Sequence, residues 1–304
     1  MTKNEDPRPL RLTHFTPLRY PGGKGKLASY VKDIIRINDL ADGEYVEPYA
    51  GGAAIALELL LQEYVTKVHI NDISVPVFSF WHSVLHETEN LIRRIIDTPL
   101  TVDEWDRQKD IFKTQDGHSR LDVGFATFFL NRTNRSGILN AGVIGGRDQT
   151  GNWKIDARYN ARELAFRIES IANVASRICL TNFDAVDFLR NGRLHWPKKT
   201  LIYLDPPYYE KGRHLYYDFY SPSDHADVAL MVKDLIDQQS WIVSYDDVTQ
   251  IHELYEGCPC IQYTIGYSAR STRQGAEVMF FSDGLKIPPL SGPLQLVGDM
   301  SAAA

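Results

Sequence analysis

Four consecutive residues, Asp205, Pro206, Pro207 and Tyr208, carry groups suited to chemistry at an amine nitrogen. The Asp205 carboxylate can accept one hydrogen of an amino group, and the Pro206 carbonyl, fixed between two proline rings, can accept the other. Two such acceptors would orient the nitrogen lone pair towards an electrophile. Tyr208 offers a flat face on which an extruded base could stack. The alternative is an aspartate that ends a strand and is followed by a proline turn with no chemical role.

The segments around this tetrapeptide predict the elements that position it. Short apolar runs that end in Gly, Pro or Asp predict buried strands at residues 45–47, 67–71 and 201–204. Helical periodicity follows at residues 53–64 and 226–238. Alternation of this kind predicts an α/β fold with a mostly parallel sheet and helices on both of its faces.

The C-terminal part of the chain predicts further strands at residues 241–244, 261–267 and 277–281, which would form an antiparallel edge. Residues 85–174 show helical periodicity that a glycine-rich excursion interrupts. We therefore expect a catalytic domain of residues 1–84 and 175–287 that contains a helical insertion at 85–174. Residues 288–304 are rich in Pro, Gly, Ser and Ala and are expected to form a flexible tail.

The distribution of charge singles out this insertion. A net charge of −6 disfavours a protein that simply coats nucleic acid. Between residues 131 and 167 the sign reverses, because seven basic residues face three acidic ones, namely Arg132, Arg135, Arg147, Lys154, Arg158, Arg162 and Arg167 against Asp148, Asp156 and Glu163. This segment is the candidate for touching phosphate groups, although a solvated, Arg-rich helix face would give the same pattern.

The N-terminus lacks the apolar stretch of an export signal, and no long uninterrupted apolar run predicts a membrane span. Cysteines are sparse: Cys179 stands alone, and the Cys258-Pro259-Cys260 pair lacks the second pair of ligands of a structural zinc site. These features predict a cytoplasmic protein that needs no metal and does not associate with membranes.

At these residues the sequence resembles the Dam-like, D12 class of DNA adenine methyltransferases, whose active-site signature is D-P-P-Y. The order of the motifs along the chain is also the family's order. The resemblance implies a Rossmann-like, S-adenosylmethionine-dependent methyltransferase sheet and transfer of a methyl group to adenine N6 in double-stranded DNA. It assigns the catalytic role to Asp205, Pro206, Pro207 and Tyr208.

The resemblance also implies a cofactor-binding set. The run Leu18-Arg19-Tyr20-Pro21-Gly22-Gly23-Lys24 is similar to the family's opening motif, and Glu47-Pro48-Tyr49-Ala50-Gly51-Gly52 is similar to its cofactor loop, although a further glycine is common where Ala53 stands. Asp72 matches an acidic residue that binds ribose hydroxyls. The implied S-adenosylmethionine contacts are Tyr20, Lys24, Glu47, Pro48, Tyr49, Gly51, Asp72, Phe183, Asp184 and Asp205.

The run from Asn131 to Gly137 resembles the family's N-R-x-x-x-x-G stretch, which opens the DNA-recognition region. The implied DNA contacts are Asn131, Arg132, Asn134 and Arg135, divided between phosphate and base edges. An Asn- and Arg-rich turn held by its own hydrogen bonds is the alternative, and Arg132 could belong to that scaffold.

The sequence is also compatible with other functions. The same loop chemistry serves enzymes that methylate RNA, a protein glutamine or cytosine N4, although Asp205 favours adenine. A catalytically inactive DNA-binding protein on the same scaffold is a second alternative. The sequence leaves the target site undetermined, allows a companion restriction endonuclease, and is compatible with a monomer or a weak dimer.

Overall fold

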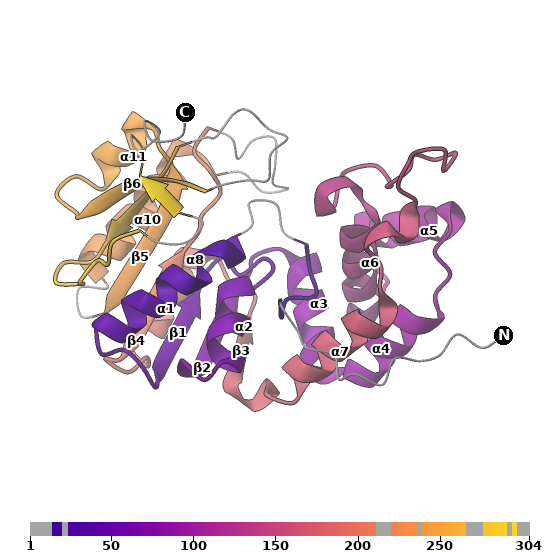
Figure 1. The fold of residues 1–304 in the computed structure, drawn as a ribbon, viewed down its shortest axis with the longest axis horizontal. Coiled ribbons are helices and arrows are strands. Elements are labelled where there is room, and N and C mark those ends of the chain that lie inside the picture. Colours follow the sequence, from indigo (N-terminus) through magenta and orange to yellow (C-terminus); the bar gives the residue numbers. More distant parts are fainter. Residues whose placement is uncertain are drawn as a thin grey trace, which may run out of the picture.

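The computed structural model describes residues 14–19, 24–210, 220–235, 239–265, 276–290 and 294–296. Its described strands form one sheet in the order β3-β2-β1-β4-β5-β7-β6-β8 (Figure 1). Their bounds are β1 (Gly43–Glu47), β2 (Val65–Asn71), β3 (Ile178–Thr181), β4 (Thr200–Leu204), β5 (Ser240–Asp246), β6 (Cys260–Ile265), β7 (Glu277–Phe281) and β8 (Leu294–Leu296).

Strands β1 to β5 pair in parallel, and β7 pairs antiparallel with both β5 and β6. The prediction of a mostly parallel sheet with an antiparallel C-terminal edge is therefore confirmed. Two strands lie outside the predicted set. One is β3, and the other is β8, which pairs antiparallel with β6. Leu294–Leu296 thus belongs to the sheet, within the segment expected to be a tail, because Leu294 buries its side chain in the core.

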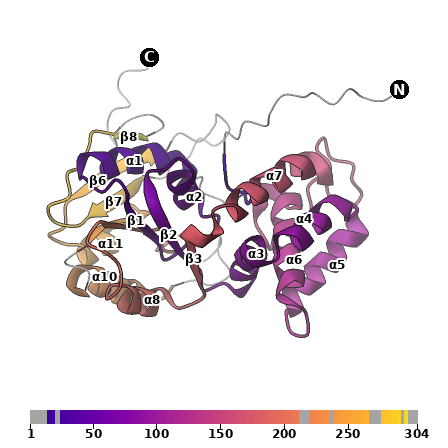
Figure 2. The same cartoon turned by 90° about the horizontal axis from the view of Figure 1, so that it is seen from below.

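The described helices are α1 (Ala28–Ile37), α2 (Ala54–Leu61), α3 (Val75–His86), α4 (Thr88–Asp97), α5 (Val102–Thr114), α6 (Arg120–Thr133), α7 (Ala161–Ala172), α8 (Ala185–Gly192), α10 (Pro222–Leu235) and α11 (Thr249–Leu254). Helices α1 and α2 cover one face of the sheet, and α8, α10 and α11 cover the other (Figure 2). Strand residues alternate between these two layers: Tyr203 packs with the first and Leu204 with the second.

Helices α3 to α7 form a helical block beside the sheet (Figure 1). Its central pair is α3 and α6, which approach closely at Gly124, where a Cβ atom would lie 2.5 Å from the Ser79 carbonyl oxygen. Ser119 and Asp122 form a capping box that starts α6. Helix α3 also reaches the sheet domain, because Trp81 donates a hydrogen bond to the Gly51 carbonyl. None of the helices within the described ranges has the length and apolar character needed to cross a bilayer.

Candidate active site

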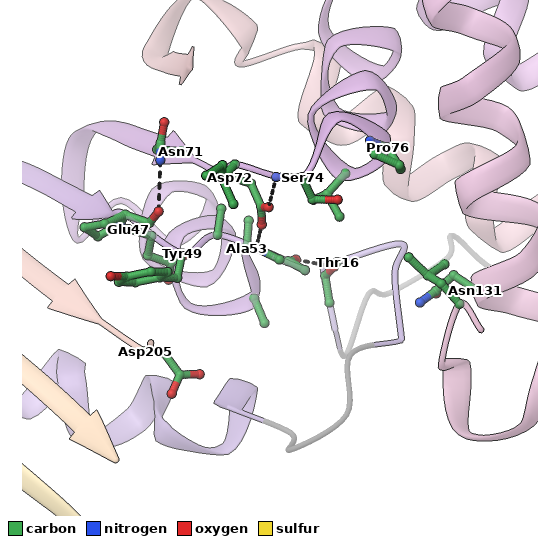
Figure 3. A pocket seen from close by; sticks show the side chains of 18 of the residues that line it. Thr16, Glu47, Tyr49, Ala53, Asn71, Asp72, Ser74, Pro76, Asn131 and Asp205 are labelled. Atoms are coloured by element: carbon green, nitrogen blue, oxygen red, sulfur yellow. Dashed lines mark hydrogen bonds between the residues drawn. The ribbon is translucent and has the colours of Figure 1, made fainter. Parts of the chain in front are cut away.

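A cavity of about 740 Å³ opens at the carboxyl ends of the parallel strands, between the sheet and the helical block (Figure 3). Ligands of α/β folds bind at this edge because the loops that follow adjacent strands meet there. The cavity is lined by Glu47 at the end of β1, Asp72 after β2, Phe183 after β3 and Asp205 after β4. The structure thus brings together predicted site residues that lie far apart in the sequence.

Asp72 organises the loop that follows β1. Its two carboxylate oxygens accept backbone hydrogen bonds from Gly51, at 2.8 Å, and from Ser74, at 2.9 Å. Gly51 has a φ of 45°, a left-handed conformation that glycine adopts at little cost. Ala53 adopts a similar left-handed conformation with a φ of 46°, at the position where the family often has glycine. The carboxylate at position 72 therefore fixes the shape of the predicted cofactor loop.

Asn71 is a buried residue that the sequence analysis missed. Its amide nitrogen donates to the Pro48 and Phe183 carbonyls, both at 3.0 Å. Its side-chain oxygen accepts from the Thr181 hydroxyl and the Phe183 backbone nitrogen. One asparagine thus joins the loops after β1, β2 and β3, although it belongs to no sequence motif.

Glu47 is almost completely buried in the cavity wall. One of its oxygens accepts hydrogen bonds from the Tyr45 hydroxyl and the Ala56 backbone nitrogen, both at 3.1 Å. Burial outweighs these two bonds and raises the pKa of Glu47 to about 8. A carboxyl group in this environment holds its proton at neutral pH.

Asp205 is oriented by the neighbouring strand. The Ser244 hydroxyl of β5 donates to an Asp205 oxygen at 3.0 Å and shares a 2.8 Å hydrogen bond with the Tyr203 hydroxyl. Tyr208 is held in the same way from β7, because its hydroxyl donates to Glu277 at 2.7 Å. Glu277 is buried and also accepts from Tyr263. Ser244 and Glu277 lie far from the signature in sequence, so no local pattern could have identified them.

Aromatic residues close one side of the cavity. The hydroxyl groups of Tyr49 and Tyr220 lie 3.1 Å apart, with the rings in an edge-on arrangement. Burial raises the pKa of Tyr220 to about 12, so the group stays protonated. Tyr220 was not predicted, since no motif surrounds it. Three exposed apolar side chains also line the cavity: Ile73, Val75 and Phe183, with exposed fractions of 47%, 48% and 53%.

The remaining predicted site residues occupy different settings. Tyr20 and the side chain of Lys24 lie outside the described residues. Asp184 caps α8 by accepting hydrogen bonds from the Val186 and Asp187 backbone nitrogens. Pro206 is buried, and Pro207 lines the cavity beside Asp205. Within the described ranges, no cluster of His, Cys, Asp and Glu is arranged to hold a metal ion.

The sequence pattern of the D12 class N6 adenine-specific DNA methyltransferases matches residues 20–268. This chain belongs to that family. As a D12 class enzyme it methylates adenine N6 in DNA, with S-adenosylmethionine as the methyl donor of the family. The earlier resemblance is therefore confirmed over most of the chain.

Similar proteins include the Type II methyltransferase M.MjaIII of Methanocaldococcus jannaschii. It is 25% identical over 205 residues, which cover 63% of this chain and 68% of that protein. A solved structure of a candidate methyltransferase from Escherichia coli is 10% identical, with a TM-score of 0.33 over 86% of this chain and 87% of its own. A candidate methylase from Haemophilus influenzae is 11% identical, with a TM-score of 0.29 over 83% and 97% of the two chains.

In this D12 class enzyme the predicted DNA contacts lie at the end of α6 and in the following turn, η2 (Arg135–Gly137). Asn134 is completely buried: its side chain accepts from the Trp105 indole and donates to the Ile138 and Leu139 carbonyls. Asn131 is also buried and bonds to the backbone. Both side chains therefore hold the turn.

The two arginines of this stretch differ from each other. Arg132 donates through Nε to the Arg158 carbonyl at 2.7 Å. Burial, together with the nearby charges of Arg19 and Arg167, lowers the pKa of Arg132 to about 10. Arg135 is exposed on the surface of the helical block. The hydrogen bond of Arg132 to the Arg158 backbone agrees with the scaffold alternative, and Arg135 is the accessible cation of the motif.

Proposed function

We propose that the enzyme holds a flipped adenine between Asp205 and Tyr208 and methylates it at a specific DNA site. The observation that carries this proposal is the support of both side chains from neighbouring strands. Ser244 fixes the Asp205 carboxylate, and Glu277 fixes the Tyr208 ring through its hydroxyl. Side chains that are held before substrate arrives need little reorganisation during the reaction.

Asp205 and the Pro206 carbonyl would accept the two N6 hydrogens, so that the nitrogen lone pair points into the cavity. As the new N–C bond forms and the methyl–sulfur bond of the donor breaks, positive charge would develop on N6; the Asp205 carboxylate would stabilise this charge and could accept the N6 proton that is then lost. The Tyr208 ring provides the face on which the extruded base stacks. Asp205 is therefore the catalytic residue, and Ser244 is its positioning residue.

The cavity residues fit S-adenosylmethionine. Its volume of about 740 Å³ lies within the range of small-molecule sites. The exposed side chains of Ile73, Val75 and Phe183 would cover the faces of an adenine ring. The backbone of the loop at Pro48, Tyr49 and Gly51 would contact the cofactor, in the conformation that the hydrogen bond from Gly51 to Asp72 stabilises. Glu47 would form part of the cavity wall. Bound S-adenosylmethionine supplies the electrophilic methyl group.

DNA would approach along the helical block, where Arg135 is exposed and Lys154 and Arg158 follow in the same basic stretch. Target specificity and action on double-stranded DNA belong to this proposal. The Type II relative supports a companion restriction endonuclease. A monomer or a weak dimer would suffice, because every proposed catalytic group comes from one chain.

The test is transfer of labelled methyl from S-adenosylmethionine to unmethylated DNA by the wild type and by Asp205→Ala, followed by digestion to nucleosides. Label in N6-methyladenine from the wild type alone is the expected result. Label on cytosine, or on RNA in a parallel reaction, would overturn the substrate assignment. An active Asp205→Ala variant would overturn the catalytic role of Asp205.

A further inference from the structure

Residues 14–19, here called the N-terminal bridge, connect the sheet domain with the helical block. At the sheet end, the Thr16 hydroxyl donates to the Gly52 carbonyl of the cofactor loop at 2.5 Å (Figure 3). His14, Phe15 and Thr16 line the cavity. The bridge is thus part of the wall of the proposed cofactor pocket.

At the other end, Asn131 binds the bridge through a reciprocal pair of hydrogen bonds. Its side-chain oxygen accepts from the Arg19 backbone nitrogen, and its amide donates to the Arg19 carbonyl, both at 2.7 Å. The second amide hydrogen goes to the Gly137 carbonyl at 2.9 Å. Both amide hydrogens of Asn131 are therefore used on backbone groups, and the side chain is only 3% exposed.

Gly137 makes room for the same contact. It has a φ of 76°, and a Cβ atom there would lie 2.5 Å from the Arg19 carbonyl oxygen and 2.9 Å from the Arg19 Cβ. A side chain at position 137 would push the bridge away from α6. The first residue of the N-R-x-x-x-x-G stretch, Asn131, thus binds the Arg19 backbone, and the last, Gly137, leaves the space that Arg19 occupies.

Two arginines strengthen this attachment. Arg167 of α7 donates to the Thr16 carbonyl at 2.8 Å, and the Arg19 guanidinium donates to the Asn134 carbonyl at 3.2 Å. The helical block therefore holds the bridge at both of its ends. A displacement of Arg19 would therefore also move Thr16, three residues earlier in the bridge, and its hydrogen bond to the Gly52 carbonyl.

We infer that Asn131, which itself lies at the margin of the cavity, is a positioning residue of the cofactor pocket that acts by holding the N-terminal bridge, and that it makes no contact with DNA. The inference rests on the proposal that the cavity binds S-adenosylmethionine. Without the Asn131 side chain, the Arg19 and Gly137 backbone groups lose their partners in a buried site. The bridge would then detach from α6, and the pocket wall formed by residues 14–16 would loosen.

The experiment compares Asn131→Ala with the wild type in binding S-adenosylhomocysteine by calorimetry, without DNA. We expect the affinity for this ligand to fall about tenfold. The KM for S-adenosylmethionine should rise by a similar factor while kcat changes little. Binding of a short DNA duplex without the cofactor should match that of the wild type.

Asn38→Ala is the matched control. Asn38 caps the end of α1 and, like Asn131, forms a reciprocal pair of hydrogen bonds with the backbone of a distant residue, here Lys286; it also donates to Ile34 of its own helix. It lies outside the cavity lining, so its loss should lower stability and leave the affinity for S-adenosylhomocysteine unchanged. A difference between the two variants separates positioning of the pocket from general destabilisation.

Thr16→Val cuts the other end of the bridge without touching α6. It should weaken S-adenosylhomocysteine binding and spare DNA binding, and it decides the question if Asn131→Ala does not fold. Unchanged affinity for S-adenosylhomocysteine in Asn131→Ala would overturn the inference; if Asn131→Ala does not fold, the same result in Thr16→Val would do so. A loss of DNA affinity in Asn131→Ala with normal binding of S-adenosylhomocysteine would also overturn it. Failure of the proposed function is distinguishable, because the wild type itself would then not bind S-adenosylhomocysteine.

Discussion

The proposed catalytic aspartate, Asp205, is positioned by a residue of a neighbouring strand. Asp205 directly follows β4, but its carboxylate is oriented by Ser244 of β5, and Ser244 is in turn bonded to Tyr203. Asp205 and Tyr208 could be predicted from sequence because both belong to one four-residue signature. Their supports, Ser244 and Glu277, could not be found, since a lone Ser or Glu on a strand carries no signal until the sheet order is known.

Replacing Ser244 tests this dependence. Ser244→Ala should lower kcat by roughly ten- to a hundredfold, because a carboxylate displaced by about 1 Å loses its alignment with the amine. The KM for S-adenosylmethionine should stay near the wild-type value. Ser240→Ala, at the start of the same strand, is the control, and steady-state methylation kinetics measure both. Equal kcat values in the two variants would contradict the positioning role.

The raised pKa of Glu47 predicts that the free energy of unfolding depends on pH. Its pKa is about 8 in the folded protein and near 4.5 when unfolded, so between these values the folded state holds a proton that the unfolded state has released. Stability therefore falls as pH rises through this range, by up to about 1.4 kcal/mol per pH unit, and levels off above pH 8.

Glu47→Gln removes this titration and keeps an oxygen for the Tyr45 and Ala56 donors. Urea denaturation at pH 6, 7 and 8 should show the variant gaining stability relative to the wild type as pH rises. Parallel stability profiles of the two proteins would mean that Glu47 is ionised in the fold.

The elements of the sheet were largely predictable, because apolar runs ending in Gly, Pro or Asp mark β1, β2 and β4. Two strands escaped for different reasons. The four residues of β3 are only partly buried except at Ile178, so their hydrophobic signal is weak. The three residues of β8 follow a Pro-, Ser- and Gly-containing stretch that indicates a loop, and only the tertiary contact with β6 makes them a strand.

Helix α8 offers a prediction that separates two roles of Asp184. As the N-cap, Asp184 accepts from the backbone nitrogens of Val186 and Asp187. Asp184→Ala should lower the free energy of unfolding by about 1 kcal/mol, and Asp184→Ser, which preserves a cap, by much less. Chemical denaturation measures both. If both variants instead lose S-adenosylhomocysteine affinity at unchanged stability, Asp184 is primarily a cofactor contact.

In the whole molecule, one acidic chain must bind an acidic polymer. The net charge is −6, so attraction to DNA has to come from a local basic surface. The sequence alone predicts such a surface in the insertion, but not which of its basic side chains are accessible. Side-chain packing decides this: Arg132 is turned to the Arg158 carbonyl, and Arg147 is paired with Asp106 at 2.7–2.8 Å, whereas Arg135 is exposed.

Arg135→Ala should weaken DNA binding and reduce the slope of log K against log salt concentration by about 1, as expected for one lost phosphate contact. Arg36→Ala on α1, an exposed arginine of the sheet domain, is the control and should leave the slope unchanged. Titration of a labelled duplex at several salt concentrations provides the slopes. An unaltered slope in Arg135→Ala would remove Arg135 from the phosphate contacts.

The short strand β8 has a consequence for self-association. Tyr263 and Ile265 of β6 pair with Leu296 and Leu294, so β8 covers an edge that would otherwise present unpaired amide and carbonyl groups. An open edge is a template on which a second molecule can add its own strand, and a three-residue edge strand offers little of it. Deleting Leu294–Leu296 would therefore expose β6 and favour aggregation, even though the catalytic groups would be intact.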